Sequence, residues 1–242
     1  MEKIKYIFFD LDDTLLTSRV ASLMAYKKVY KKFKPFRIVS EDKFLNICKE
    51  AKREYINDSK YTTYPRYLFW KKIIDKLHIC VEIVDIVTVI NMYWNAILEN
   101  IETYEGALNL LKTLKRDGYY IGIITSGDFL SKARKLISCH LDKYIDGLFP
   151  TELVISDKST GEIYQYVLDS LNVKATGCVM VGDVPDQDAT PAKKIGFTTV
   201  LGTMRYGGKE LSDTTMSSVD YSISSLDKLL NVLERINNER VS

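Results

Sequence analysis

The chain has 242 residues, of which 46% are apolar, so it is long enough to bury one large core or two smaller ones. Its 34 basic and 32 acidic side chains give a net charge of +2, which offers no global argument for a nucleic-acid or membrane partner. The N-terminus lacks the apolar segment of a signal peptide, and no apolar run approaches the ~18 residues that span a bilayer. We therefore expect a cytoplasmic globular protein.

The middle of the chain differs in charge from the rest. Residues 17–100 hold 16 Lys and Arg against 9 Asp and Glu, which makes this segment basic. Such a bias could steer anionic substrates, although a solvated, Lys-rich helix face is its commoner meaning.

The cysteines point to a reducing compartment. No two of them form a C-x-x-C pair, and all lie among apolar neighbours. We therefore expect buried, reduced thiols rather than disulfides or zinc ligands at Cys48, Cys80, Cys139 and Cys178.

An apolar run at the N-terminus ends abruptly in carboxylates. Residues 4–9 are aromatic and β-branched with almost no polar alternation, which predicts a short strand covered on both faces in a parallel sheet. Asp10, Asp12 and Asp13 follow, with Thr14 next to them. Ionised carboxylates this close repel one another, so a cation that holds them together is the best explanation. The plainer alternative is a strand end followed by a helix N-cap.

Residues 17–102 predict an all-helical insert, a small bundle with its own core. Helical spacing covers 20–33, a stretch from Glu41 to Tyr55, 68–77 and 83–98. The last of these is rich in Ile and Val and would also suit a strand, but its length favours a helix. The first helix carries an apolar face made of Val20, Leu23, Met24, Tyr30 and Phe33.

From residue 103 onward, helix and strand patterns alternate. Helices are predicted at 107–116, 129–139, 162–171 and 189–195, with a last helix after Asn231, and strands at 120–124, 153–155, 178–181 and 198–201. This rhythm predicts an α/β fold, a Rossmann-like, doubly wound and mainly parallel sheet.

Further polar clusters lie at the ends of these predicted strands. Thr125 and Ser126 stand just before a helix, where a hydroxyl and backbone N–H groups can bind phosphate. Asp183 and Asp188 follow another strand, and Lys158 offers a cation ahead of a helix. Each cluster alone could be an ordinary turn, but open α/β sheets bind ligands at the carboxyl ends of their strands. Carboxylates from two strands favour Mg²⁺ as the metal.

Taken together, these residues resemble the haloacid dehalogenase-like hydrolase superfamily. The segment Phe9 to Leu15 is similar to its first motif, D-x-D-x-T; Thr125-Ser126-Gly127 to its second, Lys158 to its third, and Gly182-Asp183 with Asp188 to its fourth. The resemblance implies a Rossmann-like catalytic core formed by residues 1–16 and 103–242. It also implies a helical cap at residues 17–102, as in subfamily I.

The resemblance implies a Mg²⁺-dependent phosphatase that hydrolyses small phosphorylated metabolites through an aspartyl-phosphate. Asp10 would be the nucleophile and Asp12 the general acid and then base, with a pKa raised by the neighbouring carboxylate. Asp10, the Asp12 backbone carbonyl and Asp183 would bind Mg²⁺, with Asp188 as a ligand or in the outer shell. Thr125, Ser126 and Lys158 would bind phosphate, while Thr14 supports the turn and Asp13 takes no part in the chemistry.

Asp12 favours phosphoryl transfer, because the dehalogenase branch lacks this carboxylate. Two alternatives stay open: a phosphomutase of the same superfamily, and a non-enzymatic protein that binds a phosphorylated ligand. Ser126 stands where many relatives have Asn, and Ser159 where many have Pro, which bears on how Lys158 is aimed.

The remaining candidates lie outside these motifs. His78 and His140 are interpreted as packing or surface residues, because neither follows a predicted strand. Arg19, Tyr64 and Arg66 are candidates for substrate contact from the cap, with solvated surface roles equally open. Hinges are expected at residues 16–18 and 98–104. The oligomeric state is left open.

Overall fold

The computed structural model describes residues 3–58, 66–207 and 217–241. The chain forms two compact units: Met1–Thr17 with Thr103–Ser242, here called the core unit, and Ser18–Glu102, here called the helical unit. These limits differ by one residue from the boundaries drawn from the sequence. That the helical unit acts as a cap stays a prediction.

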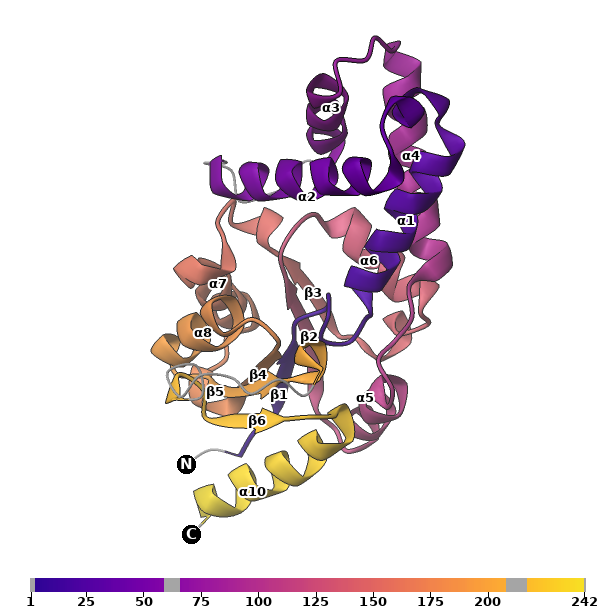
Figure 1. Cartoon of the computed structure of the whole chain (residues 1–242). Helices are drawn as coiled ribbons and strands as arrows, with labels where there is room; N and C mark the ends of the chain where they lie inside the picture. Colours follow the sequence, from indigo (N-terminus) through magenta and orange to yellow (C-terminus); the bar gives the residue numbers. More distant parts are fainter. Residues whose placement is uncertain (1–2, 59–65, 208–216, 242) are drawn as a thin grey trace. The chain divides into compact units, whose positions relative to one another are not determined.

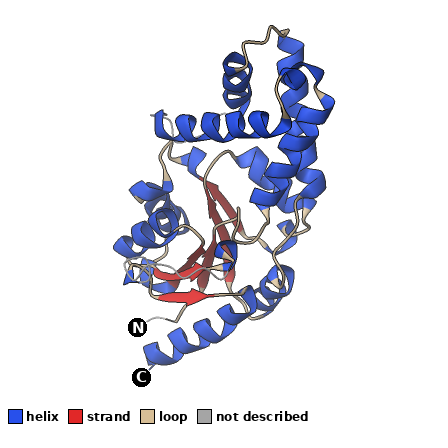
Figure 2. Cartoon of the chain, in the orientation of Figure 1, coloured by secondary structure: helices blue, strands red, loops and turns tan. Residues whose placement is uncertain are grey.

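The core unit is built on one parallel sheet of six strands (Figure 2). In spatial order, the strands are β3 (Gly147–Pro150), β2 (Tyr120–Thr125), β1 (Tyr6–Phe9), β4 (Cys178–Gly182), β5 (Thr198–Gly202) and β6 (Tyr221–Ile223). The chain moves outward from β1 in both directions, so the sheet is doubly wound. The predicted α/β, Rossmann-like fold is confirmed.

The strand order brings three chain segments together at one edge. Phe9 at the end of β1 lies opposite Ile123 of β2 and Val181 of β4. The N–H of Asp10 donates to the carbonyl of Val181 at 2.8 Å. The residues that follow β1, β2 and β4 therefore meet where the strand order reverses, which is where doubly wound sheets bind ligands.

Helices precede or follow the strands of the core unit along the chain (Figure 1). Their bounds are α5 (Ala107–Arg116), α6 (Phe129–Ser138), α7 (Glu162–Leu171), α8 (Thr190–Ile195) and α10 (Leu229–Val241). All five were expected from the sequence, and α5 and α7 have the predicted bounds. Gly118 closes α5 with a φ of +81° and an N–H that donates to the carbonyl of Lys115 at 3.1 Å.

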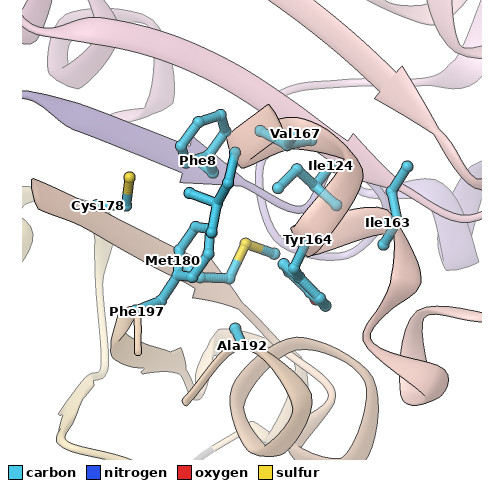
Figure 3. Packing of buried hydrophobic residues seen from close by; sticks show 10 residues of the cluster. Phe8, Ile124, Ile163, Tyr164, Val167, Cys178, Met180, Ala192 and Phe197 are labelled. Carbon is cyan, nitrogen blue, oxygen red and sulfur yellow. The ribbon is translucent and has the colours of Figure 1, made fainter. Parts of the chain in front are cut away.

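The centre of β1 is buried on both faces, as its unbroken apolar run predicts. On one face, Phe8 packs edge-on against Phe197 with ring centroids 5.9 Å apart, in a cluster that includes Met180 and Tyr164 of α7 (Figure 3). Gly122 of β2 lies beside this ring, because a Cβ there would stand 2.5 Å from Phe8 Cδ1. A rigid, apolar β1 holds the carboxylates that follow it.

The helical unit contains α1 (Ser18–Lys32), α2 (Glu41–Asp58), α3 (Arg66–Lys76) and α4 (Ile83–Asn100) (Figure 1). Within residues 18–58 and 66–102, no segment forms a strand, so the helical reading of 83–98 is confirmed. A capping box of Glu82 and Asp85 begins α4.

The predicted apolar face of α1 is wrong in part. Val20, Leu23 and Met24 are exposed, whereas the helix buries Ala21 and Ala25, along with Ser18 and Val29. Small side chains let α1 lie close to α4, its main neighbour in the unit.

Two edge strands differ from the prediction. The strand expected at 153–155 is wrong: Thr151–Leu153 forms a 3₁₀ turn, Ile155 is exposed, and the strand is Gly147–Pro150. Gly147 and Pro150 are residue types that argue against a strand, which is why the sequence did not predict this one. Pro150 is tolerated because β3 lies at the edge of the sheet. The other edge strand, β6, was not predicted, because three residues are too few to show a period.

No helix in the described parts of the chain is long and apolar enough to cross a membrane.

The prediction of buried cysteine thiols is confirmed for Cys48 and Cys178. It is wrong for Cys80, which is exposed, and for Cys139, which is half-buried. None of the four forms a disulfide within the described residues.

Candidate active site

Asp10 is the first residue after β1 and is 6% exposed. The ammonium of Lys158 donates to its Oδ1 at 2.7 Å, and the hydroxyl of Thr14 donates to its Oδ2 at 3.4 Å. Burial raises the pKa of Asp10 to about 7, against the opposing effect of Lys158. Without further cations, this carboxylate is therefore protonated in part near neutral pH.

The turn after Asp10 is held by backbone hydrogen bonds. Asp13 has a left-handed φ of +63°, and its N–H donates to the carbonyl of Leu16 at 2.7 Å. Asp tolerates this conformation better than most residues, which accounts for its place there without a chemical role. The single hydroxyl proton of Thr14 is shared between Asp10 and Asp183, whose Oδ1 lies 3.2 Å from the hydroxyl oxygen, so Thr14 links the ends of β1 and β4.

Asp188 braces the loop after β4. Its Oδ2 accepts hydrogen bonds from the N–H groups of Asp183 at 3.0 Å and Val184 at 2.8 Å, while its Oδ1 forms an ion pair with Lys158. The Asp188 carboxyl occupies the place that a Cβ at Gly182 would take, so only glycine fits there. These contacts make Asp188 a support for both the loop and Lys158.

Three carboxylates in the described residues lie close enough to share a metal ion. Asp10, Asp183 and Asp188 are buried, and each offers an oxygen within 4.8 Å of the others. Burial, followed by the charge of Asp188, raises the pKa of Asp183. A buried set of mutually repelling, hard oxygen donors fits the preference of Mg²⁺.

Lys158 lies in the middle of this group and is 1% exposed. Burial alone would lower its pKa, but the neighbouring carboxylates of Asp10 and Asp188 raise it well above its ordinary value. Ser159, which stands where a proline was expected, donates its N–H to Asp157 Oδ1 at 2.9 Å. Proline has no N–H and could not make this bond. The turn that orients Lys158 is therefore fixed by the side-chain cap of Asp157 and not by the ring of a proline.

The turn after β2 contains Thr125 and Ser126. Thr125 is 1% exposed, and within the described parts of the chain its hydroxyl has no hydrogen-bond partner. Gly127 follows with a φ of +111°, and its N–H donates to Thr151 Oγ1 at 3.0 Å. A buried hydroxyl without a partner is unfavourable, and a bound phosphate oxygen would satisfy it.

Asp12 has partners that the sequence interpretation missed. Lys132 contacts its Oδ2 and Lys135 its Oδ1, both from α6. The nearest charged groups to the Asp12 carboxylate are therefore two ammonium groups, where the sequence interpretation expected a neighbouring carboxylate. The i, i+3 spacing places both lysines on one helix face, but nothing local marks that face as buried.

Arg205 was also missed. It lies in the 3₁₀ turn Met204–Tyr206 after β5 and forms an ion pair with Asp183 Oδ2. Burial would lower its pKa, but Asp183 outweighs this and raises it. The hydroxyl of Tyr206 donates to the carbonyl of Asp183 at 2.7 Å. Both oxygens of Asp183 are thus engaged, one by Thr14 and one by Arg205.

Other candidates lie outside the motifs. His78 and His140 are exposed, as the surface interpretation expected. Arg19 is exposed in the helical unit. Tyr64 lies outside the described residues, and so does the side chain of Arg66; substrate contact from these three positions stays a prediction.

Comparison with known proteins identifies the family. Residues 7–201 match the family model described as haloacid dehalogenase-like hydrolase. A glyceraldehyde 3-phosphate phosphatase of Pyrococcus furiosus is 30% identical over 239 residues, covering 98% of this chain and 96% of its own. A glyceraldehyde 3-phosphate phosphatase of Methanocaldococcus jannaschii is 29% identical over 238 residues, covering 96% of this chain and 98% of its own.

Solved structures show the same fold. A putative beta-phosphoglucomutase from Thermotoga maritima superposes with a TM-score of 0.73 at 19% identity, covering 96% of this chain and 99% of its own. At this identity, the likeness concerns the fold alone. The family model, which matches most of the sequence, and the relative that is 30% identical show that the chain belongs to the haloacid dehalogenase-like hydrolase family.

Proposed function

We propose that the chain is a Mg²⁺-dependent phosphatase that hydrolyses small phosphorylated metabolites through an aspartyl-phosphate on Asp10. The relatives that match nearly its whole length and are named phosphatases support this proposal. The observation that carries it is a buried carboxylate, Asp10, held beside the ammonium of Lys158 and within reach of two further carboxylates.

In the proposed first step, a carboxylate oxygen of Asp10 attacks phosphorus. The bond from phosphorus to the leaving oxygen breaks, its electron pair stays on that oxygen, and Asp12 supplies the proton. In the second step, Asp12 takes a proton from water as the water oxygen attacks phosphorus. The bond between Asp10 and phosphorus breaks, and inorganic phosphate leaves.

Three residues would hold the phosphoryl group. Lys158 provides a buried positive charge, Thr125 a hydroxyl that has no partner within the described residues, and Ser126 a backbone N–H. Donors that are already in place cost little reorganisation when negative charge develops on the phosphoryl oxygens.

Asp10, Asp183 and the backbone carbonyl of Asp12 would bind Mg²⁺, which would neutralise phosphoryl charge and orient the group. Asp188 would be a further ligand or part of the outer shell, and its oxygens also engage two backbone N–H groups and Lys158. Asp188 would then hold both the metal-binding loop and the lysine.

Residues 1–16 and 103–242 would form the catalytic core, and residues 17–102 the cap of subfamily I. The helical unit begins directly after the first motif and ends before the second, which supports this assignment. Closure of such a cap would exclude water from the aspartyl-phosphate.

The test is phosphate release from p-nitrophenyl phosphate and a panel of phosphorylated metabolites that includes glyceraldehyde 3-phosphate. We expect Mg²⁺-dependent release, and a loss of about 10³-fold or more in Asp10→Asn, which removes the nucleophile. Asp13→Asn is the matched control, since Asn also tolerates the left-handed turn and should retain activity. An active Asp10→Asn protein would contradict the proposal.

The same assay separates the two alternatives. A phosphomutase would yield an isomer of the substrate with little free phosphate. A non-enzymatic binding protein would bind the phosphorylated ligand and release nothing from it.

A further inference from the structure

We propose that Lys132 is a second phosphate-binding cation, which contacts Asp12 in the ligand-free protein and a phosphoryl oxygen when substrate is bound. This assignment rests on the proposed phosphatase function and adds a residue to its site. Lys132 belongs to none of the motifs that define that site.

The first observation is the burial of the lysine. The side chain of Lys132 is 2% exposed, although its helix, α6, lies at the surface and has exposed neighbours at Phe129 and Leu130. A buried ammonium is stable only beside negative charge or strong acceptors. Its partner in the structure, Asp12, has a side chain that is 26% exposed, so the ion pair is not fully enclosed by protein.

The second observation is the path of the side chain along the phosphate-binding turn. A Cβ built on Gly127 would lie 3.3 Å from Lys132 Cε and 3.8 Å from its Nζ. Gly127 follows Thr125 and Ser126 directly, and Thr125 carries the hydroxyl that lacks a partner within the described residues. The ammonium of Lys132 therefore lies beside the turn that carries an unsatisfied buried hydroxyl, and a bound anion can accept from both groups.

The third observation is that Asp12 is held twice. Lys135 contacts Oδ1, while Lys132 contacts Oδ2. If Lys132 moves to a phosphoryl oxygen, Lys135 still orients the carboxylate, and Oδ2 becomes accessible for proton exchange with the leaving oxygen. A lysine suits this exchange, because its ammonium has three donors on a flexible stem.

The two lysines therefore have different expected roles. Lys132 would bind phosphate, so its loss should weaken binding of the anion. Lys135 would be a positioning residue that acts through Asp12, so its loss should lower kcat and leave binding nearly unchanged.

Calorimetric titration with inorganic phosphate in the presence of Mg²⁺ tests this difference. For Lys132→Met, we expect the phosphate Kd to rise about tenfold, as for loss of one charge-assisted hydrogen bond, and the KM for p-nitrophenyl phosphate to rise in parallel. Lys132→Arg should recover part of the affinity. Lys135→Met should keep the phosphate Kd within about twofold while kcat falls. Arg134→Met, on the exposed face of α6, is the control and should change neither.

An unchanged phosphate Kd in a folded Lys132→Met protein would overturn the assignment and leave Lys132 as a clamp on Asp12. Circular dichroism verifies folding, and Lys132→Gln, which retains hydrogen-bonding ability without the charge, replaces the methionine variant if that variant does not fold. Wild-type protein that neither binds nor releases phosphate would overturn the proposed function itself. Wild-type protein that binds phosphate as tightly as Lys132→Met would overturn only the role of Lys132.

Discussion

At the scale of single residues, a proton and the proposed metal ion compete for the carboxylate of Asp10. Burial raises the pKa of Asp10 to about 7 in the absence of metal, with Asp188 and Asp183 contributing in the same direction. Below that pH the folded protein carries a proton on Asp10, and a metal ion must displace it. The metal-free site is therefore sensitive to pH near neutrality.

We expect Mg²⁺ affinity to increase with pH across this range. The raised pKa means that Asp10 is mostly protonated at pH 6 and mostly ionised at pH 8, and Mg²⁺ binds the ionised form. The Mg²⁺ Kd should fall by roughly tenfold from pH 6 to pH 8, as expected for release of about one proton. Calorimetry in buffers of different ionisation enthalpy would measure both the Kd and the proton release. A Kd independent of pH, or a dependence that survives in Asp10→Asn, would contradict this explanation.

Arg205 and the proposed Mg²⁺ ion compete for the carboxylate of Asp183. The guanidinium of Arg205 contacts Asp183 Oδ2, the carboxylate proposed to bind Mg²⁺. Two cations on one carboxylate repel each other, so Arg205→Met should tighten Mg²⁺ binding, by about tenfold at pH 8, and destabilise the metal-free protein. Calorimetry and thermal unfolding with and without Mg²⁺ would measure the two effects.

The matched control is Arg235→Met, which removes an exposed arginine paired with Glu239 in α10. It should leave Mg²⁺ binding unchanged. Weaker Mg²⁺ binding in Arg205→Met would show the opposite role, in which Arg205 orients Asp183 for the metal.

At the scale of elements, the position of β1 depends on the absence of a side chain at Gly122 of the neighbouring strand β2. Phe8 fills the space beside Gly122, so Gly122→Ala would push a methyl group to within 2.5 Å of the ring. We expect a loss of about 1–3 kcal/mol in the free energy of unfolding, measured by urea denaturation, because this core cannot expand freely. Gly177→Ala is the control, since a Cβ there meets no atom within 4 Å. Equal stabilities for the two variants would show that β1 and β2 adjust to the methyl group.

At the scale of the whole molecule, the chain leaves and re-enters the core unit at adjacent positions. Leu16 forms an isolated antiparallel bridge with Thr103, and the N–H of Tyr104 donates to the carbonyl of Leu15 at 2.9 Å. Within the described parts of the chain, all six strands belong to the core unit. The helical unit is therefore an insertion at one point of a sheet whose strands are complete without it.

Replacing residues 18–102 with a short Gly-Ser linker tests this organisation. Since the ends already pair, the linker should add little closure entropy, and the shortened chain should unfold cooperatively and still bind Mg²⁺. Phosphatase activity should fall and lose selectivity among substrates if the removed residues contact substrate, as the sequence predicts. Circular dichroism, calorimetry and the metabolite panel are the measurements. A shortened chain without a cooperative transition would show that the core unit depends on the helical unit for folding.

Local pattern was sufficient for most of the fold. Unbroken apolar runs identified β1, β2, β4 and β5, and helical spacing identified the helices on both sides of the sheet. The polar residues at strand ends were also visible, because a parallel sheet gathers the residues that follow its strands. Asp10, Thr14, Lys158, Asp183 and Asp188 do lie together in the structure.

Tertiary structure decided what each of these residues contacts. The lysines of α6 reach Asp12, and Arg205 reaches Asp183, only because distant segments become neighbours across the sheet edge. Tertiary structure also decided where β3 forms, because a strand at the sheet edge can contain a proline. It decided which face of α1 is buried, because the close neighbour α4 selects the small side chains of α1. The sequence by itself determined which elements form and which carboxylates follow the strands, since those depend on nearby residues. The charge balance of the site depends on burial and on partners far along the chain, so only the folded structure determined it.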